Sequence, residues 1–167
     1  MSKKLLPTII TLANLILGIT SLWYTMAGTY REAALAILFA MVLDGLDGRI
    51  ARHFQVSSDF GKELDSLSDL VSFGVAPALL TYGVALSSLG TPGLMVAIVF
   101  ALCGAIRLAR FNVLNIMDYF IGVPITFAGS LMALLALLAP APPLFLYPVA
   151  MLVLSYLMVS NIKVRKY

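Results

Sequence analysis

Four aspartates, arranged in two pairs, give this sequence its clearest potential for chemistry. Asp44 and Asp47 are three residues apart, and Asp65 and Asp69 are four apart. Side chains at these separations lie on one face of a helix. Carboxylates are costly at membrane depth, about 2.5 to 3.5 kcal/mol each, and four that converge need a cation. Ligands that are all oxygen favour Mg²⁺, Mn²⁺ or Ca²⁺, and no His or Cys set is nearby to suit zinc.

Two consecutive helices must position these carboxylates, because a short loop around residues 56–59 separates the pairs. Helices joined by so short a loop are antiparallel neighbours, so we expect the two pairs to face each other near one end. The structural alternative is that the aspartates only form interfacial ion pairs with Arg49, Arg52 and Lys62.

Glycine and arginine extend the pattern. Gly48 and Gly61 lack a Cβ where two helices and a ligand would approach closely. Arg52 follows Asp44 by eight residues, two turns along the same face, and its guanidinium suits bidentate binding of a phosphate. The lone histidine, His53, is expected at the lipid–water interface rather than as a base.

The composition sets the environment of this cluster. The chain has 167 residues, of which 61% are hydrophobic and 11% charged, and its mean hydropathy is +1.00. A soluble domain carries roughly 25% charged residues, so the composition excludes a water-soluble monomer. A net charge of +3 does not indicate nucleic-acid binding. Cys103 is the only cysteine, which excludes an intramolecular disulfide.

Charge-free runs and breakers predict the elements. A span needs about 20 residues, and Pro and Gly divide the longer runs. We expect an all-α integral membrane protein, a single domain over residues 1–167, with six spans at about 8–27, 32–53, 60–86, 92–112, 121–139 and 143–162. Ten of the eleven Lys and Arg residues then lie on the side of the termini, with Arg31 alone opposite. The positive-inside rule places both termini and the aspartates in the cytoplasm.

Written out, the charged segment is Asp44-x2-Asp47-Gly48-x2-Ala51-Arg52-x8-Gly61-x3-Asp65-x3-Asp69. It resembles the signature of the CDP-alcohol phosphotransferase family at every defined position and spacing. The resemblance implies six transmembrane helices, a homodimer in the cell membrane, and an active site that faces the cytoplasm. It also implies transfer of a phosphatidyl-type group from a CDP-linked lipid to an alcohol, with release of CMP.

The resemblance implies roles for individual residues. The four aspartates would hold two divalent cations, Mg²⁺ or Mn²⁺ with Ca²⁺ as a further candidate, and Asp69 would also accept the proton of the acceptor hydroxyl. The CDP-lipid donor, CDP-diacylglycerol or an ether analogue of the CDP-archaeol type, would be bound by Gly48, Ala51, Arg52, Ser58 and Gly61.

Stretches outside the signature bear on the acceptor. Residues 71–78, 107–112 and 120–124 are similar to the branch of the family that uses L-serine. Serine brings a carboxylate, which needs a cation, and Arg107 and Arg110 lie one turn apart. We expect these arginines, with Asn112 and Ser72, to contact serine or phosphate.

The first span carries a stripe of small and polar residues on one face: Thr11, Asn14, Gly18, Ser21 and Thr25. Such stripes are typical of helix packing in membranes. Thr11 and Asn14 are also candidates for lining the donor cavity, since the opening residues 7–18 are similar to the start of the family.

Two alternative functions remain open from the sequence. A sibling enzyme would use glycerol phosphate or an inositol phosphate, but a phosphorylated acceptor needs extra basic residues and the chain has few. A divalent cation transporter would also place carboxylates in the membrane, although transporters built on repeats place related elements in both halves, and no matching acidic pair occurs in the second half.

Overall fold

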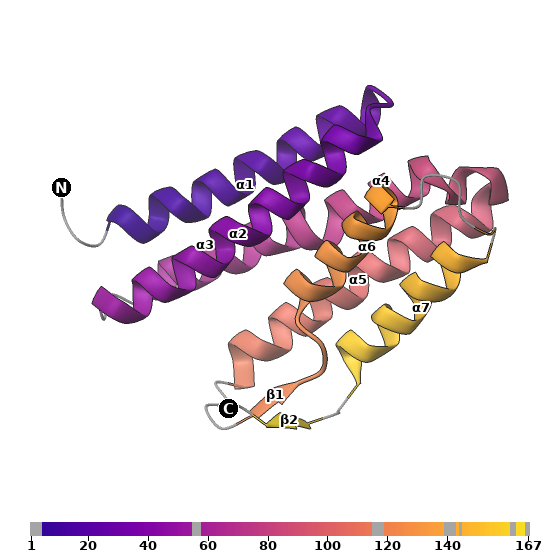
Figure 1. Ribbon diagram of the computed structural model, residues 1–167. Helices are drawn as coiled ribbons and strands as arrows, with labels where there is room; N and C mark the ends of the chain where they lie inside the picture. Colours follow the sequence, from indigo (N-terminus) through magenta and orange to yellow (C-terminus); the bar gives the residue numbers. More distant parts are fainter. Residues whose placement is uncertain are drawn as a thin grey trace.

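The computed structural model describes residues 5–54, 58–114, 119–138, 143, 145–160 and 163–165, with side chains at 7–46, 58–113, 122–138, 143 and 145–160. Its helices run back and forth along one direction as a bundle (Figure 1). The start of α1 and the end of α7 therefore lie toward the same end of the bundle.

The first two helices form a tight hairpin. α1 covers Leu5–Met26 and α2 covers Tyr30–Phe54. The turn contains Gly28 with a φ of 76°, a left-handed conformation that glycine adopts without steric cost. Near the turn, the Ser21 hydroxyl on α1 donates to the Ala33 carbonyl on α2 at 2.9 Å. The helices agree with the expected first two spans to within about three residues at their ends.

The third span is one continuous helical rod with a change of pitch in its middle. α3 (Asp59–Asp69) passes into a π-helical turn, η1 (Leu70–Val75), and then into α4 (Ala76–Val84). Pro77 has no amide proton, so the Phe73 carbonyl cannot receive the usual i+4 hydrogen bond. Instead, the Ala76 amide donates five residues back, to Val71. The span is expected from the apolar run of the sequence, whereas this π turn is not.

Three further helices complete the bundle. A short 3₁₀ turn, η2 (Leu86–Leu89), leads to α5 (Thr91–Leu114), which is followed by α6 (Ile125–Leu138) and α7 (Leu146–Val159). α6 begins four residues later than expected. Gly122 has a φ of 71° and Pro124 precedes the helix, so the chain turns before it can become helical.

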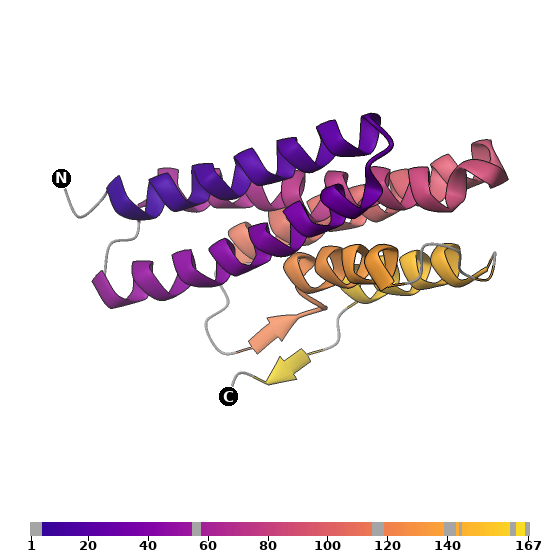
Figure 2. The ribbon, with the colours of Figure 1, turned by 45° about the horizontal axis from the view of Figure 1, so that its top comes forward.

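The purely helical prediction needs one correction. Two short strands, β1 (Tyr119–Ile121) and β2 (Lys163–Arg165), pair antiparallel with Phe120 opposite Val164. The pair lies outside the helices, beside the start of α6 and the end of α7 (Figure 2). The expected spans placed β1 in the loop before the fifth span and at its first residue, and β2 after the last span. Spacing within one segment cannot show which distant segment will pair with it.

Apolar packing holds the bundle together. Ile37, Phe73, Phe100 and Met132, from four different helical segments, are all fully buried. Three of the described helices are long and apolar enough to cross a membrane, at Pro7–Met26, Asp59–Val84 and Thr91–Val113, while α6 and α7 are shorter apolar helices. The chain is thus a helical membrane protein, with many large apolar side chains exposed on its outer surface.

Candidate active site

Three aspartates from two helices come together near one end of the bundle. Asp44 projects from α2, while Asp65 and Asp69 project from α3, and each offers a carboxylate oxygen that lies within 4.8 Å of the other two. Asp69 is 8% exposed and the others are half-buried. The predicted juxtaposition of the two helices is therefore confirmed for three of the four carboxylates. The side chain of Asp47 lies outside the described residues.

Asp69 lies at the centre of the charges in this cluster. Asp44 and Asp65 repel it, while the guanidinium of Arg107 on α5 attracts it. The Asn14 amide nitrogen on α1 also donates to an Asp69 oxygen, at 3.4 Å. The Asp69 carboxylate therefore lies between two like charges, on α2 and α3, and one guanidinium on α5.

The donor set fits a divalent cation. It is made only of carboxylate oxygens, the ligands that hard ions such as Mg²⁺ and Mn²⁺ prefer, and the three oxygens are close enough to share one ion. The like charges repel one another, and binding a cation removes that repulsion. The metal class predicted from sequence is thus compatible with the geometry.

A hydrogen-bond donor to the cluster comes from α6, where the sequence pattern indicated no candidate. The Thr126 hydroxyl donates to an Asp44 oxygen at 3.2 Å. Hydrogen bonds of this kind fix the orientation of a metal-binding carboxylate. The two residues are 82 apart in the sequence, so no local spacing connects them.

The polar face of α1 holds the helix that carries Asp65 and Asp69. The Ser68 hydroxyl donates to the Thr11 carbonyl at 3.1 Å, and the Ser72 hydroxyl donates to the Asn14 carbonyl at 3.0 Å. A Cβ at Gly18 would lie 2.9 Å from the Ser72 Cα, so only glycine allows this approach. The predicted packing seam is confirmed.

This seam includes three predicted site residues, Ser72, Thr11 and Asn14. Ser72 is fully buried, and its hydroxyl faces α1, where it supports the helix. Thr11 is 4% exposed, and its hydroxyl donates to the Pro7 carbonyl within α1. Asn14 reaches Asp69, and its side-chain oxygen has no hydrogen-bond partner among the described residues.

The three α5 candidates have different surroundings. Arg107 is half-buried, faces Asp69, and has a buried Nε without a hydrogen-bond partner in the described part of the chain. Arg110 donates to the Val159 carbonyl at 2.8 Å, which ties α5 to the end of α7. Asn112 donates to Ser66 at 3.0 Å and to Glu63 at 3.3 Å, which ties α5 to α3. Arg107 is therefore the α5 cation directed at the aspartates.

The candidate donor residues are described only in part. Ser58 is the N-cap of α3, and its hydroxyl accepts from the Gly61 amide at 3.0 Å. A Cβ at Gly61 would lie 3.1 Å from that hydroxyl oxygen, so the glycine gives the cap room. The backbone of α2 includes Gly48, Ala51 and Arg52, but their side-chain surroundings lie outside the described residues.

Comparison with known proteins agrees with this arrangement. The family model described as CDP-alcohol phosphatidyltransferase matches residues 4–161, almost the whole chain. The chain belongs to this family. A family shared over this length accounts for the helical bundle and for the aspartate signature together, so the family resemblance inferred from sequence is confirmed.

Three relatives named CDP-diacylglycerol–serine O-phosphatidyltransferase align with 95% of the chain. The protein from Bacillus subtilis is 42% identical and is covered over 88% of its length. Those from Helicobacter pylori and Methanocaldococcus jannaschii are 41% and 42% identical, with 71% and 72% of their lengths covered.

Proposed function

We propose that the protein transfers the phosphatidyl group of CDP-diacylglycerol, or of its ether-lipid analogue, to the hydroxyl of L-serine. The observation that supports this most directly is the convergence of Asp44, Asp65 and Asp69 in a member of the family. The serine acceptor is supported by the names of the relatives.

The proposed cofactors are two divalent cations, Mg²⁺ or Mn²⁺, with Ca²⁺ as a third candidate. Asp44, Asp65 and Asp69 would hold them together with Asp47, which is three residues after Asp44 on α2. Bound there, the cations would neutralise the pyrophosphate of the donor and stabilise departing CMP. Thr126 would keep the Asp44 carboxylate in its binding orientation.

Asp69 is the proposed base. The serine oxygen attacks the phosphorus that bears the diacylglycerol, the bond from that phosphorus to the bridging oxygen breaks, and CMP leaves with the electron pair. The proton of the serine hydroxyl passes to the Asp69 carboxylate. Asn14 donates to one Asp69 oxygen and leaves the other available for this proton.

Binding of the two substrates is assigned to different helices. Gly48, Ala51 and Arg52 on α2, Ser58 and Gly61 at the start of α3, and Thr11 and Asn14 on α1 are proposed for the CDP-lipid. Arg107 is proposed for the serine carboxylate, since its buried Nε has no described partner and an anion would satisfy it. Arg110 and Asn112 would hold α5 in place for this contact.

The proposed setting is the cell membrane, crossed six times by one domain over residues 1–167, with the active site and both termini in the cytoplasm. The ten-to-one distribution of basic residues supports this orientation. We also propose a homodimer, as the family resemblance implies.

Release of CMP tests the function. Purified protein in detergent is incubated with CDP-diacylglycerol, Mn²⁺ or Mg²⁺, and labelled serine, glycerol phosphate or inositol phosphate. We expect CMP and labelled phosphatidylserine only with serine and a divalent cation, and neither product with chelator or with Asp69→Asn.

Other outcomes would replace the proposal. CMP release only with a phosphorylated acceptor would assign the chain to a sibling activity. Absence of CMP with every acceptor, together with Mn²⁺ flux into vesicles, would favour a transporter.

A further inference from the structure

A cavity of about 610 Å³ lies at the opposite end of the bundle from the aspartates. It is formed by the first turns of α2, the last residue of α4 and the last turn of α6, and is lined by Tyr30, Arg31, Leu35, Val84, Ala136, Leu137 and Leu138. Arg31 precedes Asp44 by thirteen residues on α2, which corresponds to about 20 Å along the helix. The cavity is therefore separate from the proposed active site.

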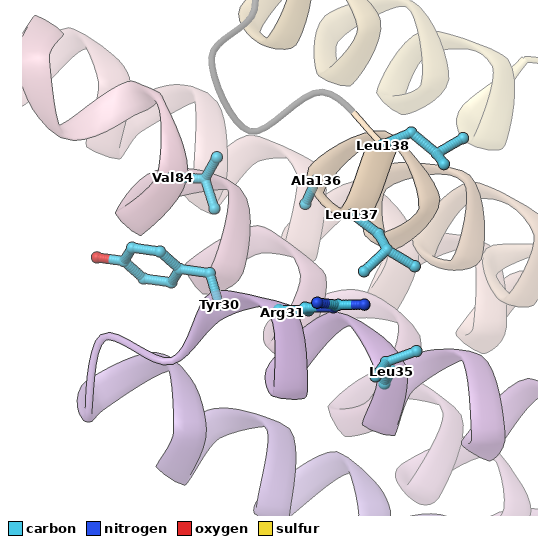
Figure 3. Close-up of a pocket in the computed structure, with 7 residues that line it drawn as sticks. All are labelled: Tyr30, Arg31, Leu35, Val84, Ala136, Leu137 and Leu138. Atoms are coloured by element: carbon cyan, nitrogen blue, oxygen red, sulfur yellow. The ribbon is translucent and has the colours of Figure 1, made fainter.

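One charge faces apolar walls in this cavity. Arg31 is the only charged side chain among the described residues that line it. Its guanidinium extends between Leu35 and Leu137, whereas the Tyr30 hydroxyl points away from it (Figure 3). The Arg31 side chain forms no hydrogen bond or ion pair with any other residue in the described part of the chain.

The neighbouring acid does not cancel this charge. Glu32 follows Arg31 directly, and consecutive residues on a helix point about 100° apart. Leu35, one turn after Arg31, does line the cavity, while Glu32 does not. The start of α2 also adds positive partial charge from its unpaired amides, which favours an anion beside Arg31.

We propose that this cavity binds an anionic phospholipid of the membrane leaflet on the side away from the active site. The phosphodiester contacts Arg31, and an acyl chain lies along Leu35, Val84 and Leu137. A single guanidinium at the edge of an apolar hollow matches an amphiphile with one negative group, since a free anion would leave the apolar walls without a partner. The volume is in the usual range for ligand pockets, roughly 300 to 1,000 Å³.

A lipid bound in this cavity would lie where α2, α4 and α6 meet. The cavity separates the start of α2 from the ends of α4 and α6, so a lipid there would contact helices that are not consecutive. The lipid would fill space that side chains leave open and would bring an anion to Arg31. We therefore expect bound lipid to raise the thermal stability of the protein.

Native mass spectrometry of the purified protein in nonionic detergent tests the inference, with added dioleoyl phosphatidylglycerol or dioleoyl phosphatidylcholine as probes. Wild-type protein should retain one phosphatidylglycerol more tightly than phosphatidylcholine. Arg31→Gln should weaken phosphatidylglycerol binding about fivefold, since one basic residue near a membrane surface contributes about that factor. It should weaken phosphatidylcholine binding less, because the choline ammonium offsets the charge of the phosphodiester. Arg31→Lys should keep most of the preference.

Two further variants separate the cavity from the charge and from catalysis. Ala136→Phe fills the cavity and should weaken binding of both lipids, with Arg31 still present. Asp69→Asn should stop CMP release without affecting lipid retention, so failure of the proposed enzyme activity does not decide this proposal.

Three results would overturn the inference. The first is equal phosphatidylglycerol binding by wild type and Arg31→Gln, and the second is unchanged lipid binding by Ala136→Phe. The third is displacement of the lipid by millimolar glycerol phosphate, which would identify the occupant as a free anion. Size-exclusion profiles and CMP release close to wild type show that Arg31→Gln remains folded.

Discussion

Polar groups have different surroundings at the two ends of the bundle. At the active-site end, polar side chains from α1, α2, α3, α5 and α6 converge on buried or half-buried carboxylates. At the opposite end, described hydroxyls donate to backbone carbonyls of neighbouring helices instead. The Tyr147 hydroxyl, for example, donates to the Leu135 carbonyl at 2.9 Å.

The difference shows where an apolar bundle accommodates charge. Asp44 accepts from Thr126 on α6 and Asp69 accepts from Asn14 on α1, so removing one partner affects a shared arrangement. The opposite end instead has Arg31 at the edge of an apolar cavity. No described residue forms a hydrogen bond or ion pair with its side chain. Substitutions at the active-site end should therefore reduce activity far more than those at the opposite end.

The largest effect is expected from Asp69→Asn, which removes both a cation ligand and the proposed base. We expect turnover to fall about 10³-fold, in the range typical of a lost general base, measured as CMP release at saturating serine. Asp59→Asn makes the same change in the same helix at a fully exposed position. Equal losses in the two variants would remove the special role of Asp69.

A smaller effect is expected from Arg107→Ala, which removes the guanidinium that faces Asp69. The KM for serine should rise about 10- to 100-fold, as for the loss of a charged hydrogen bond, with less change in the KM for CDP-diacylglycerol. Arg110→Ala is the matched comparison, since Arg110 binds the Val159 carbonyl and should change the serine KM less. The opposite ranking would make Arg110 the acceptor residue.

Thr126→Val probes the support of the cation ligands with almost no change in volume. Loss of its hydrogen bond to Asp44 should weaken Mn²⁺ binding about tenfold, measured by electron paramagnetic resonance titration. Thr20→Val is the control, because the Thr20 hydroxyl donates only within α1, to the Ile16 carbonyl at 2.8 Å. Unchanged Mn²⁺ affinity in Thr126→Val would exclude a supporting role.

The smallest effect concerns stability and arises at the π turn. A Cβ at Gly129 on α6 would lie 2.7 Å from the Phe73 Cα, and backbone cannot yield as a flexible side chain does. Gly129→Ala should lower the melting temperature in detergent by about 5 °C, as expected for overpacking. A Cβ at Gly45 would meet nothing within 4 Å, so Gly45→Ala should be neutral or slightly stabilising.

The sequence by itself determined the class of protein and the centre of its site. Low charge and long apolar runs exclude a soluble fold, whatever the packing, because burying so much apolar surface needs a membrane. The spacings of Asp44, Asp65 and Asp69 place them on helix faces, and the short loop makes those helices neighbours. These inferences depend on local geometry, which the residues of one segment are sufficient to specify.

Only the tertiary structure decided which distant groups complete the site. Thr126 reaches Asp44 across 82 residues, and the Ser72 hydroxyl donates to the Asn14 carbonyl on α1. After Asp69 the helix passes into a π turn at Leu70–Val75, which the spacing of the aspartates does not predict. Contacts between helices depend on rotation and depth as well as order along the chain, and spacing within one helix does not specify either.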